Sequence, residues 1–242
     1  MKKIDYEHDD FINTPWYYRL FSFLLYWVLA PILMVIKKFF LRVKVRGKAN
    51  YKQLKKGGAV IVCNHIHPMD APMIAMSIFP TRMKIMSLED NFYKPVVGTI
   101  IKGLGALPVP KDFRYMKDFL DTFSGLAKSG KKVLIYPEGH LIKRSPTLRE
   151  FKTGAFRVAI SAGVPIIPMC YTYPGGKGLT LNILPPVYPK PDEDPKELTA
   201  KVYNIINEFF ISEMSKGETQ PKETDEVNVE QIEDEVFAKK HA

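Results

Sequence analysis

Residues 59–70, AVIVCNHIHPMD, place a histidine and a carboxylate directly after a short apolar run. The run AVIVC is too short for a helix and rich in β-branched residues, which is typical of a strand buried on both faces. The two prolines that follow, at positions 68 and 72, exclude a helix interior, because proline lacks an N–H and disfavours helical geometry in the residue before it. The sequence therefore predicts that His65 lies in a turn and that a helix begins near Asp70.

This geometry lets the side chains of His65 and Asp70 meet. An imidazole held by a carboxylate has a fixed tautomer and a free nitrogen, which can take a proton from a hydroxyl group. No serine or cysteine of the stretch is placed as a nucleophile, so a substrate hydroxyl is the expected attacking group. The alternative is that Asp70 only caps the helix and His65 is an ordinary loop histidine. The spacing alone favours this alternative.

Four motifs along the chain resemble, in order, those of the glycerolipid acyltransferases, the 1-acylglycerol-3-phosphate acyltransferase family. The first, NHIHPMD, resembles the NHxxxxD motif of that family. The resemblance covers roughly residues 45 to 190, including a helical segment, FKTGAFRVAISAG, before the last motif. The other three motifs are GALPVPK at 105–111, YPEG at 136–139 and VPIIP at 164–168.

The resemblance implies an enzyme that transfers an acyl group from acyl-CoA or acyl-carrier protein, with no cofactor besides this donor. The implied acceptor is the sn-2 hydroxyl of 1-acylglycerol 3-phosphate, and the product is phosphatidic acid. His65 would act as general base and Asp70 would orient it. The implied substrate-binding residues within the motifs are Asn64, Gly105, Lys111, Glu138 and Gly139.

Two departures from the family pattern concern the phosphate of the acceptor. Lys111 stands where the family usually has arginine, and a lysine binds phosphate without the bidentate fork. We expect Glu138 and Gly139 to lie in a turn that exposes the Glu138 side chain and backbone amides. The threonine and arginine that usually follow them are replaced by His140 and Leu141. Another lysolipid acceptor, or a lipid-binding protein without activity, is therefore an alternative. Basic residues after Gly139 could restore the lost positive charge, and Arg144 and Lys152 are our candidates. The alternative for each of them is a solvated basic face. The full set is Lys143, Arg144, Arg149, Lys152 and Arg157.

A metal site is the other chemistry that these residues suggest. His65, His67 and Asp70 form the pattern HxHxxD, and His140 could complete a set of ligands. The HxHxDH pattern of zinc hydrolases of the metallo-β-lactamase type is not met, however. We therefore expect no metal ion and a structural role for His67.

A long apolar segment precedes the motifs. Residues 20–36, LFSFLLYWVLAPILMVI, carry no charge and are bordered by aromatic residues before and lysines after. A spanning helix needs about 20 apolar residues, so a membrane span and a kinked helix lying in one leaflet are both open. Basic residues crowd after this segment, which by the positive-inside rule predicts a catalytic part on the cytoplasmic face of the cytoplasmic membrane.

The remaining sequence alternates between strand and helix signals, which predicts an α/β fold with a mixed, mostly parallel sheet flanked by helices. We expect strands at 59–63, 83–87, 132–136, 165–173 and 179–184, and helices at 71–79, 94–103, 114–129, 153–162 and 197–215. The two cysteines, Cys63 and Cys170, fall in expected buried strands and do not suggest a disulfide framework. A reducing compartment fits them better.

Charge and composition divide the chain into three parts. Residues 1–45 form the expected membrane anchor, residues 46–216 the acyltransferase domain, and residues 217–242 an acidic tail for which disorder is expected. The tail has eight acidic and three basic residues, against +9 for the whole chain, so residues 1–216 carry +14. Such a basic body needs an anionic partner. The sequence shows no nucleic-acid module, and the apolar segment points to membrane phospholipids and a lysophospholipid substrate instead.

Overall fold

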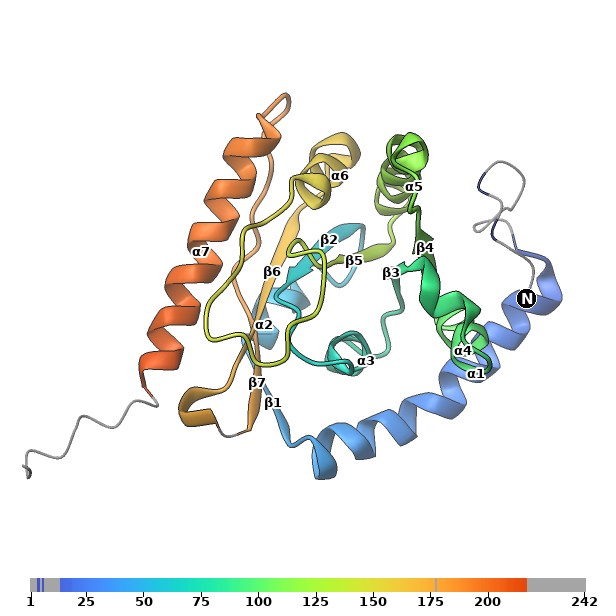
Figure 1. The fold of residues 1–242 in the computed structure, drawn as a ribbon, viewed down its shortest axis with the longest axis horizontal. Coiled ribbons are helices and arrows are strands. Elements are labelled where there is room, and N and C mark those ends of the chain that lie inside the picture. Colours follow the sequence, from blue (N-terminus) through green and yellow to red (C-terminus); the bar gives the residue numbers. More distant parts are fainter. Residues whose placement is uncertain (1–3, 5, 7–13, 177, 217–242) are drawn as a thin grey trace, which may run out of the picture.

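A seven-stranded sheet with helices on both faces forms the centre of the protein (Figure 1). The computed structural model describes residues 14–176 and 178–216, together with residues 4 and 6. The expected acidic tail, residues 217–242, lies outside the described residues. The strands are β1 (Val43–Arg46), β2 (Ala59–Cys63), β3 (Met83–Leu88), β4 (Ala106–Val109), β5 (Lys132–Ile135), β6 (Ile166–Thr172) and β7 (Leu179–Ile183).

The strand order is β1-β7-β6-β2-β5-β3-β4, and all neighbours are parallel except β6 and β7. This confirms the predicted mixed, mostly parallel sheet. Strand β2 occupies the central position, where Val60 is paired in register with Ile166 on one side and Val133 on the other. All five residues of β2 are buried, as expected for a strand that is covered on both faces.

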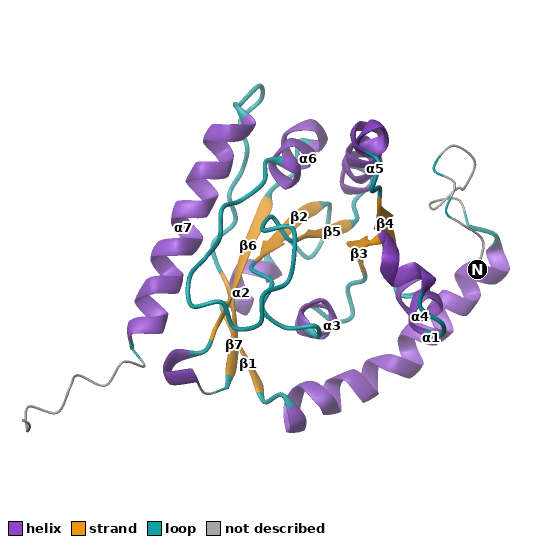
Figure 2. Ribbon diagram, viewed as in Figure 1, coloured by secondary structure: helices purple, strands orange, loops and turns teal. Residues whose placement is uncertain are grey.

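Helices cover both faces of this sheet (Figure 2). α5, α6 and α7 lie on one face, while α3, α4 and α1 lie on the other. The α-helices are α1 (Trp16–Val35), α2 (Lys48–Lys52), α3 (Asp70–Ser77), α4 (Val97–Gly103), α5 (Met116–Lys128), α6 (Gly154–Ala162) and α7 (Pro195–Ser215). Short helical turns complete the described elements: η1 (Ile36–Phe40), a π-helix that continues α1, and the 3₁₀ turns η2 (Glu89–Tyr93), η3 (Phe113–Tyr115) and η4 (Pro174–Gly176).

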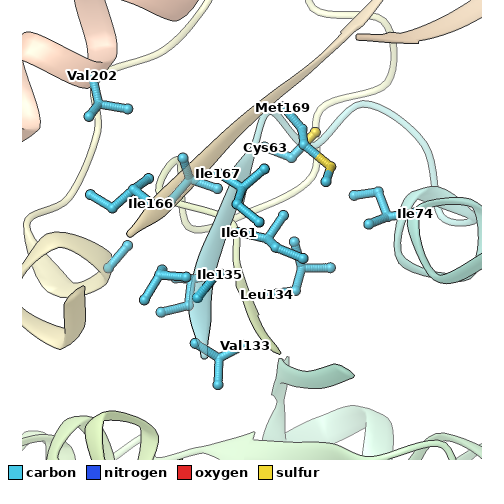
Figure 3. Packing of buried hydrophobic residues seen from close by; sticks show 14 of the residues in the cluster. Ile61, Cys63, Ile74, Val133, Leu134, Ile135, Ile166, Ile167, Met169 and Val202 are labelled. Atoms are coloured by element: carbon cyan, nitrogen blue, oxygen red, sulfur yellow. The ribbon is translucent and has the colours of Figure 1, made fainter. Parts of the chain in front are cut away.

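The core is built from aliphatic side chains of the three central strands. Ile61, Leu134 and Ile167 are fully buried in β2, β5 and β6. Figure 3 shows Ile74 of α3 and Val202 of α7 on opposite sides of these strands. Because the sheet is packed from both sides, the chain segments that follow the strands have a rigid base.

Besides the short helical turns, two strands and one helix were not expected from the sequence. Strands β1 and β4 and the short helix α2 are each only four or five residues long. β4 contains Pro108, which an edge strand tolerates because one side of its ladder is free. β1 pairs with β7, so it straddles the boundary at residue 45 that was expected between anchor and domain.

Four parallel strands, β2, β5, β3 and β4, end at the same edge of the sheet, which we call the carboxyl edge. β6 also ends there, since it is parallel to β2. Thr172 at the end of β6 pairs with Thr180 near the start of antiparallel β7, and Val43 at the start of β1 pairs with Leu179. β1 therefore begins at the carboxyl edge. The segments around this edge contain most of the residues that the sequence motifs singled out.

Helix α1 packs on the domain with one face only. Tyr26 and Ala30 are buried against a small apolar cluster that includes Met76 of α3 and Phe79. In the second turn of the helix, the hydroxyl of Ser22 donates a hydrogen bond to the carbonyl of Gly103 and accepts one from the guanidinium of Arg82. The opposite face of α1 and η1 carries large apolar side chains that are exposed to solvent. We call these residues the outer stripe: Trp16, Tyr17, Leu20, Phe21, Phe23, Leu24, Trp27, Val28, Ile32, Met34, Val35, Phe39 and Phe40.

The segment Trp16–Phe40 is long and apolar enough to cross a membrane, judged by length and composition alone. Its exposed apolar residues recur at positions such as 16, 20, 23, 24, 27 and 28, the spacing of one helix face. The N-terminal apolar helix expected from the sequence is therefore present. One of its faces packs against the domain, and the other is exposed to solvent.

Candidate functional site

The structure brings His65 and Asp70 together at the end of β2. The imidazole Nδ1 lies 3.0 Å from Oδ2 of Asp70. The same oxygen accepts hydrogen bonds from the backbone N–H groups of Ile66 (2.8 Å) and His67 (2.9 Å). Asp70 thus closes the turn that precedes α3, and α3 has no side-chain cap at its N-terminus. The alternative of a simple helix cap does not describe this geometry.

Asp70 is held from its backbone as well. Its carbonyl accepts a hydrogen bond of 3.1 Å from the hydroxyl of Tyr171, and the residue is 1% exposed. The backbone of Tyr171 is in turn bound twice by Asn64: the Asn64 side chain accepts from its N–H (2.8 Å) and donates to its carbonyl (3.0 Å). The structure therefore places Asn64, expected among the substrate-binding residues, as a buried joint between β2 and β6.

Tyr136 fixes the plane of the imidazole. Its ring stacks on His65 with a centroid separation of 3.9 Å and an interplanar angle of 11°. Burial, with Asp70 nearby, raises the pKa of Tyr136 well above its ordinary value, so the hydroxyl remains protonated. The sequence analysis considered the YPEG motif only as a turn and missed this contact. The available signal was an aromatic residue directly after an expected buried strand, at the first position of the YPEG motif.

These contacts decide what the imidazole can do. Nδ1 points at a carboxylate oxygen and is therefore the protonated nitrogen. Nε2 then carries the lone pair, and the His65 side chain is 21% exposed. An imidazole in this state can accept a proton from a hydroxyl group that reaches Nε2 from solvent or from a bound substrate.

The expected exposure of Glu138 was wrong. Its side chain is 1% exposed and pairs with Arg149, with Nη2 2.6 Å from Oε2. Oε2 also accepts from the backbone N–H of His65 at 3.3 Å, and Oε1 accepts from the N–H of Arg149 at 3.3 Å. The turn at Gly139, with φ +83°, directs the carboxylate inward, where the arginine neutralises it. Glu138 therefore positions the backbone of His65.

The long loop between β5 and α6 lies against the histidine turn (Figure 2). The N–H of Ile142 donates to the carbonyl of His65 (3.1 Å), and that of Arg144 donates to the carbonyl of Ile66 (3.2 Å). The Arg144 guanidinium lies 5.7 Å from the ring centroid of Tyr173. Lys152, near the end of the same loop, extends its ammonium over Gly139. Two of the predicted basic residues, Arg144 and Lys152, therefore border the site.

Lys111 follows β4 and lies farther along the carboxyl edge, whereas Gly105, also expected to bind substrate, precedes β4 and lies at the opposite edge, away from His65. β4 is three strand spacings from β2, which corresponds to about 14 Å. Lys111 is exposed, and its Nζ lies 2.5 Å from Oδ1 of Asp90. Gly105 precedes β4 with φ +100°, and a side chain there would crowd the carbonyl of Met83. The structure therefore places Lys111 on the same edge as His65, with an acidic partner of its own.

Neither cysteine is a nucleophile in this structure. Cys63 and Cys170 are free and buried, as expected from their strands. Burial, followed by nearby acidic groups, raises the pKa of both thiols, and only a thiolate is strongly nucleophilic. A covalent acyl-cysteine at this site is therefore disfavoured by the environment of the sulfur atoms.

Within the described part of the chain, no three His, Cys, Asp or Glu side chains form a group that could hold a metal ion. His67, one of the candidate ligands, uses Nδ1 to accept a hydrogen bond of 3.1 Å from the N–H of Met69. This contact supports the turn.

A family model described as acyltransferase matches residues 42–172, slightly more than half of the chain. The chain belongs to this acyltransferase family. This confirms the resemblance that the four motifs indicated. The match begins just before β1 and ends with β6, so it includes the histidine–aspartate pair and the loop against it.

Individual relatives agree with the family. The 1-acyl-sn-glycerol-3-phosphate acyltransferase of Salmonella typhimurium is 29% identical over 216 residues, which cover 82% of each chain. A chloroplast enzyme with the same function in its name, from Brassica napus, is 36% identical over 87 residues, a quarter of its own length. The crystal structure of the 1-acyl-sn-glycerophosphate acyltransferase PlsC from Thermotoga maritima shares the fold, with a TM-score of 0.64, 22% identity, and coverage of 85% of this chain and 89% of that chain.

The buried pair Glu138–Arg149 leads to a prediction about stability. Arg149→Met should lower the free energy of unfolding by about 3–5 kcal/mol, because it leaves a buried carboxylate unpaired. The double variant Glu138→Gln, Arg149→Met should recover much of this loss, since no uncompensated charge remains. Denaturant unfolding of the four proteins in this cycle measures both effects.

Lys117→Met serves as the control, because Lys117 forms an exposed ion pair with Asp121. Exposed pairs contribute about 0–1 kcal/mol, so little change is expected. A small effect of Arg149→Met, no larger than that of the control, would contradict the importance of the buried pair.

Proposed function

We propose that this protein acylates the sn-2 hydroxyl of 1-acylglycerol 3-phosphate, using acyl-CoA or acyl-carrier protein as donor, and so forms phosphatidic acid for phospholipid synthesis. The observation that carries the proposal is the His65–Asp70 pair, held at the end of a rigid strand with a free imidazole nitrogen. The names of the relatives supply the substrate class.

In the proposed reaction, Nε2 of His65 removes the proton of the acceptor hydroxyl while its oxygen attacks the thioester carbonyl. The new ester C–O bond forms and the C–S bond breaks, and the departing thiolate takes the proton from the imidazolium. Asp70 stabilises the positive charge on the ring between these steps. The acyl group passes directly from donor to acceptor, so no side chain of the protein needs to carry it.

For the acceptor phosphate we propose a seat formed by basic residues of the carboxyl edge. Arg144 and Lys152 border the histidine turn, and Lys111 matches the family motif farther along the edge. Binding there requires Lys111 to exchange its contact with Asp90 for the phosphate. Both partners are exposed, so that exchange costs little.

We further propose that α1 lies along the membrane interface on the cytoplasmic side, and does not cross the bilayer. Helix α1 is joined to the domain through Ser22 in its second turn and through Tyr26 near its middle, and both contact the guanidinium of Arg82. A charged group therefore lies against the helix near its middle. A helix held in this way can insert only its outer stripe into one leaflet. The membrane span that the sequence left open is disfavoured by these contacts.

The catalytic proposal predicts that His65→Ala lowers acyl transfer by about 10²–10⁴-fold, since general base catalysis contributes that much. Asp70→Asn should also be strongly impaired, because an amide cannot stabilise the imidazolium. His140→Ala is the matched control, as His140 is exposed on the loop. Transfer rates of labelled acyl groups measure the effects, and circular dichroism checks the fold.

A folded His65→Ala protein with nearly full activity would refute this mechanism. If wild-type and variant proteins both bound lysolipid without any transfer, the chain would instead be a lipid-binding protein on the same fold.

The phosphate proposal predicts a selective change in KM. Lys111→Ala, Arg144→Ala and Lys152→Ala should each raise KM for the acceptor about tenfold or more, because a hydrogen bond to a charged group contributes about 1.5–3 kcal/mol. KM for the donor should stay near the wild-type value. Lys117→Ala, on the exposed face of α5, is the control. An unchanged acceptor KM in all three variants would place the seat elsewhere.

The membrane proposal predicts that the full chain stays on vesicles at high salt, because apolar burial is not screened. The triple variant Leu20→Glu, Leu24→Glu, Val28→Glu should be released, since it places charges on three exposed positions of the outer stripe away from Tyr26 and Ala30. Ile211→Glu is the control, as Ile211 is an exposed apolar residue of α7. Vesicle flotation gives the bound fraction, and release of the wild type by salt alone would contradict an apolar anchor.

A further inference from the structure

An open surface cavity with a mixed polar and apolar lining lies beside the C-terminal end of α1, away from the histidine–aspartate pair. It has a volume of about 440 Å³, a size common among sites for small ligands. Its apolar lining comes from α1, β1 and α3. Five basic residues of η1, the segment after it, β1 and α2 complete the lining: Lys37, Lys38, Arg42, Lys44 and Lys48. We call this cavity the basic pocket.

The positive charges of the basic pocket have no counter-charge among the residues that the structure describes. No acidic side chain of that part of the chain lines the cavity, and none forms an ion pair with the five. Lys37 donates a hydrogen bond of 2.7 Å to the hydroxyl of Ser77. Burial and the charge of Lys48 lower the pKa of Lys37 to about 8. Such a concentration of cations favours an anionic ligand.

The basic pocket lies at the other end of the sheet from the proposed seat of the acceptor phosphate. The pocket borders β1, whereas Lys111 follows β4, and these two end strands are six strand spacings apart, about 28 Å. One phosphate group cannot reach both places. A ligand in the basic pocket is therefore a second molecule.

The surroundings of the pocket indicate where this ligand comes from. Phe39 and Phe40 of η1, 61% and 77% exposed, belong to the outer stripe and adjoin Lys38 in sequence. Figure 1 shows α1 leading through this turn into β1. With the outer stripe in the leaflet, the pocket lies at the level of the lipid head groups. Basic pockets beside membrane-bound helices are suited to anionic head groups.

We propose that the basic pocket binds the phosphate group of a second anionic phospholipid, separate from the acyl acceptor. This rests on the interfacial position of α1 proposed above. Bound there, the phospholipid supplies the missing counter-charge and fixes the rotation of α1 on the membrane, so that the carboxyl edge faces the leaflet.

The test compares two variants with the same loss of charge. Lys44→Gln, Lys48→Gln removes two cations of the basic pocket, while Lys55→Gln, Lys56→Gln removes two exposed lysines of the segment between α2 and β2, which do not line the cavity. Flotation of the full chain is measured with vesicles of phosphatidylcholine alone and of phosphatidylcholine mixed with phosphatidic acid. A parallel series adds soluble inorganic phosphate.

We expect wild type and the Lys55/Lys56 variant to prefer the mixed vesicles equally. The pocket variant should lose roughly 25-fold in affinity for them, about fivefold for each cation, and keep its binding to phosphatidylcholine. Acyl transfer to acceptor dispersed in detergent should be unchanged, which separates this proposal from the catalytic one.

Three outcomes would overturn the proposal. Equal losses in both variants would show a diffuse electrostatic attraction without a site. Loss of the preference in the presence of inorganic phosphate would identify free phosphate as the ligand. A raised acceptor KM in the pocket variant would make the pocket part of the acceptor site.

Discussion

One carboxylate oxygen, Oδ2 of Asp70, organises the site. It accepts hydrogen bonds from the imidazole of His65 and from two backbone amides of the turn between β2 and α3. Burying a carboxylate is costly unless it is hydrogen-bonded, and these three donors meet that requirement. The same contacts set the tautomer of the histidine and the course of the chain. The same atom therefore links the reactive group to the local fold.

The turn around this oxygen is supported from two neighbouring strands. Asn64 and Tyr171 join the end of β2 to β6, and Tyr136 and Glu138 contact His65 from the end of β5. The central position of β2 makes this possible, because only an internal strand has a neighbour on each side. Loss of any one support would leave the others, so the imidazole is constrained by several independent contacts.

The parts of this arrangement that depend on residues close together in the chain could be predicted from the sequence. The apolar run of β2, the prolines after it and the helix start at Asp70 are local features, and their combination correctly places His65 in a turn. The burial of Glu138 could not be predicted, because its partner Arg149 comes from an irregular loop. The stack of Tyr136 on His65 depends on the pairing of β2 with β5, which the sequence does not specify. β1 and β4 are too short for a periodic signal.

The proposed position of helix α1 determines which measure of substrate concentration sets the reaction rate. In the interfacial position proposed for α1, the protein would meet its proposed lysolipid acceptor within the same leaflet, where the lipid diffuses in two dimensions. The encounter rate then follows the mole fraction of lysolipid among its neighbours, and not its amount per unit volume of the cell. Inert lipid added to the leaflet would slow the reaction by dilution even when the total amounts of enzyme and acceptor stay constant.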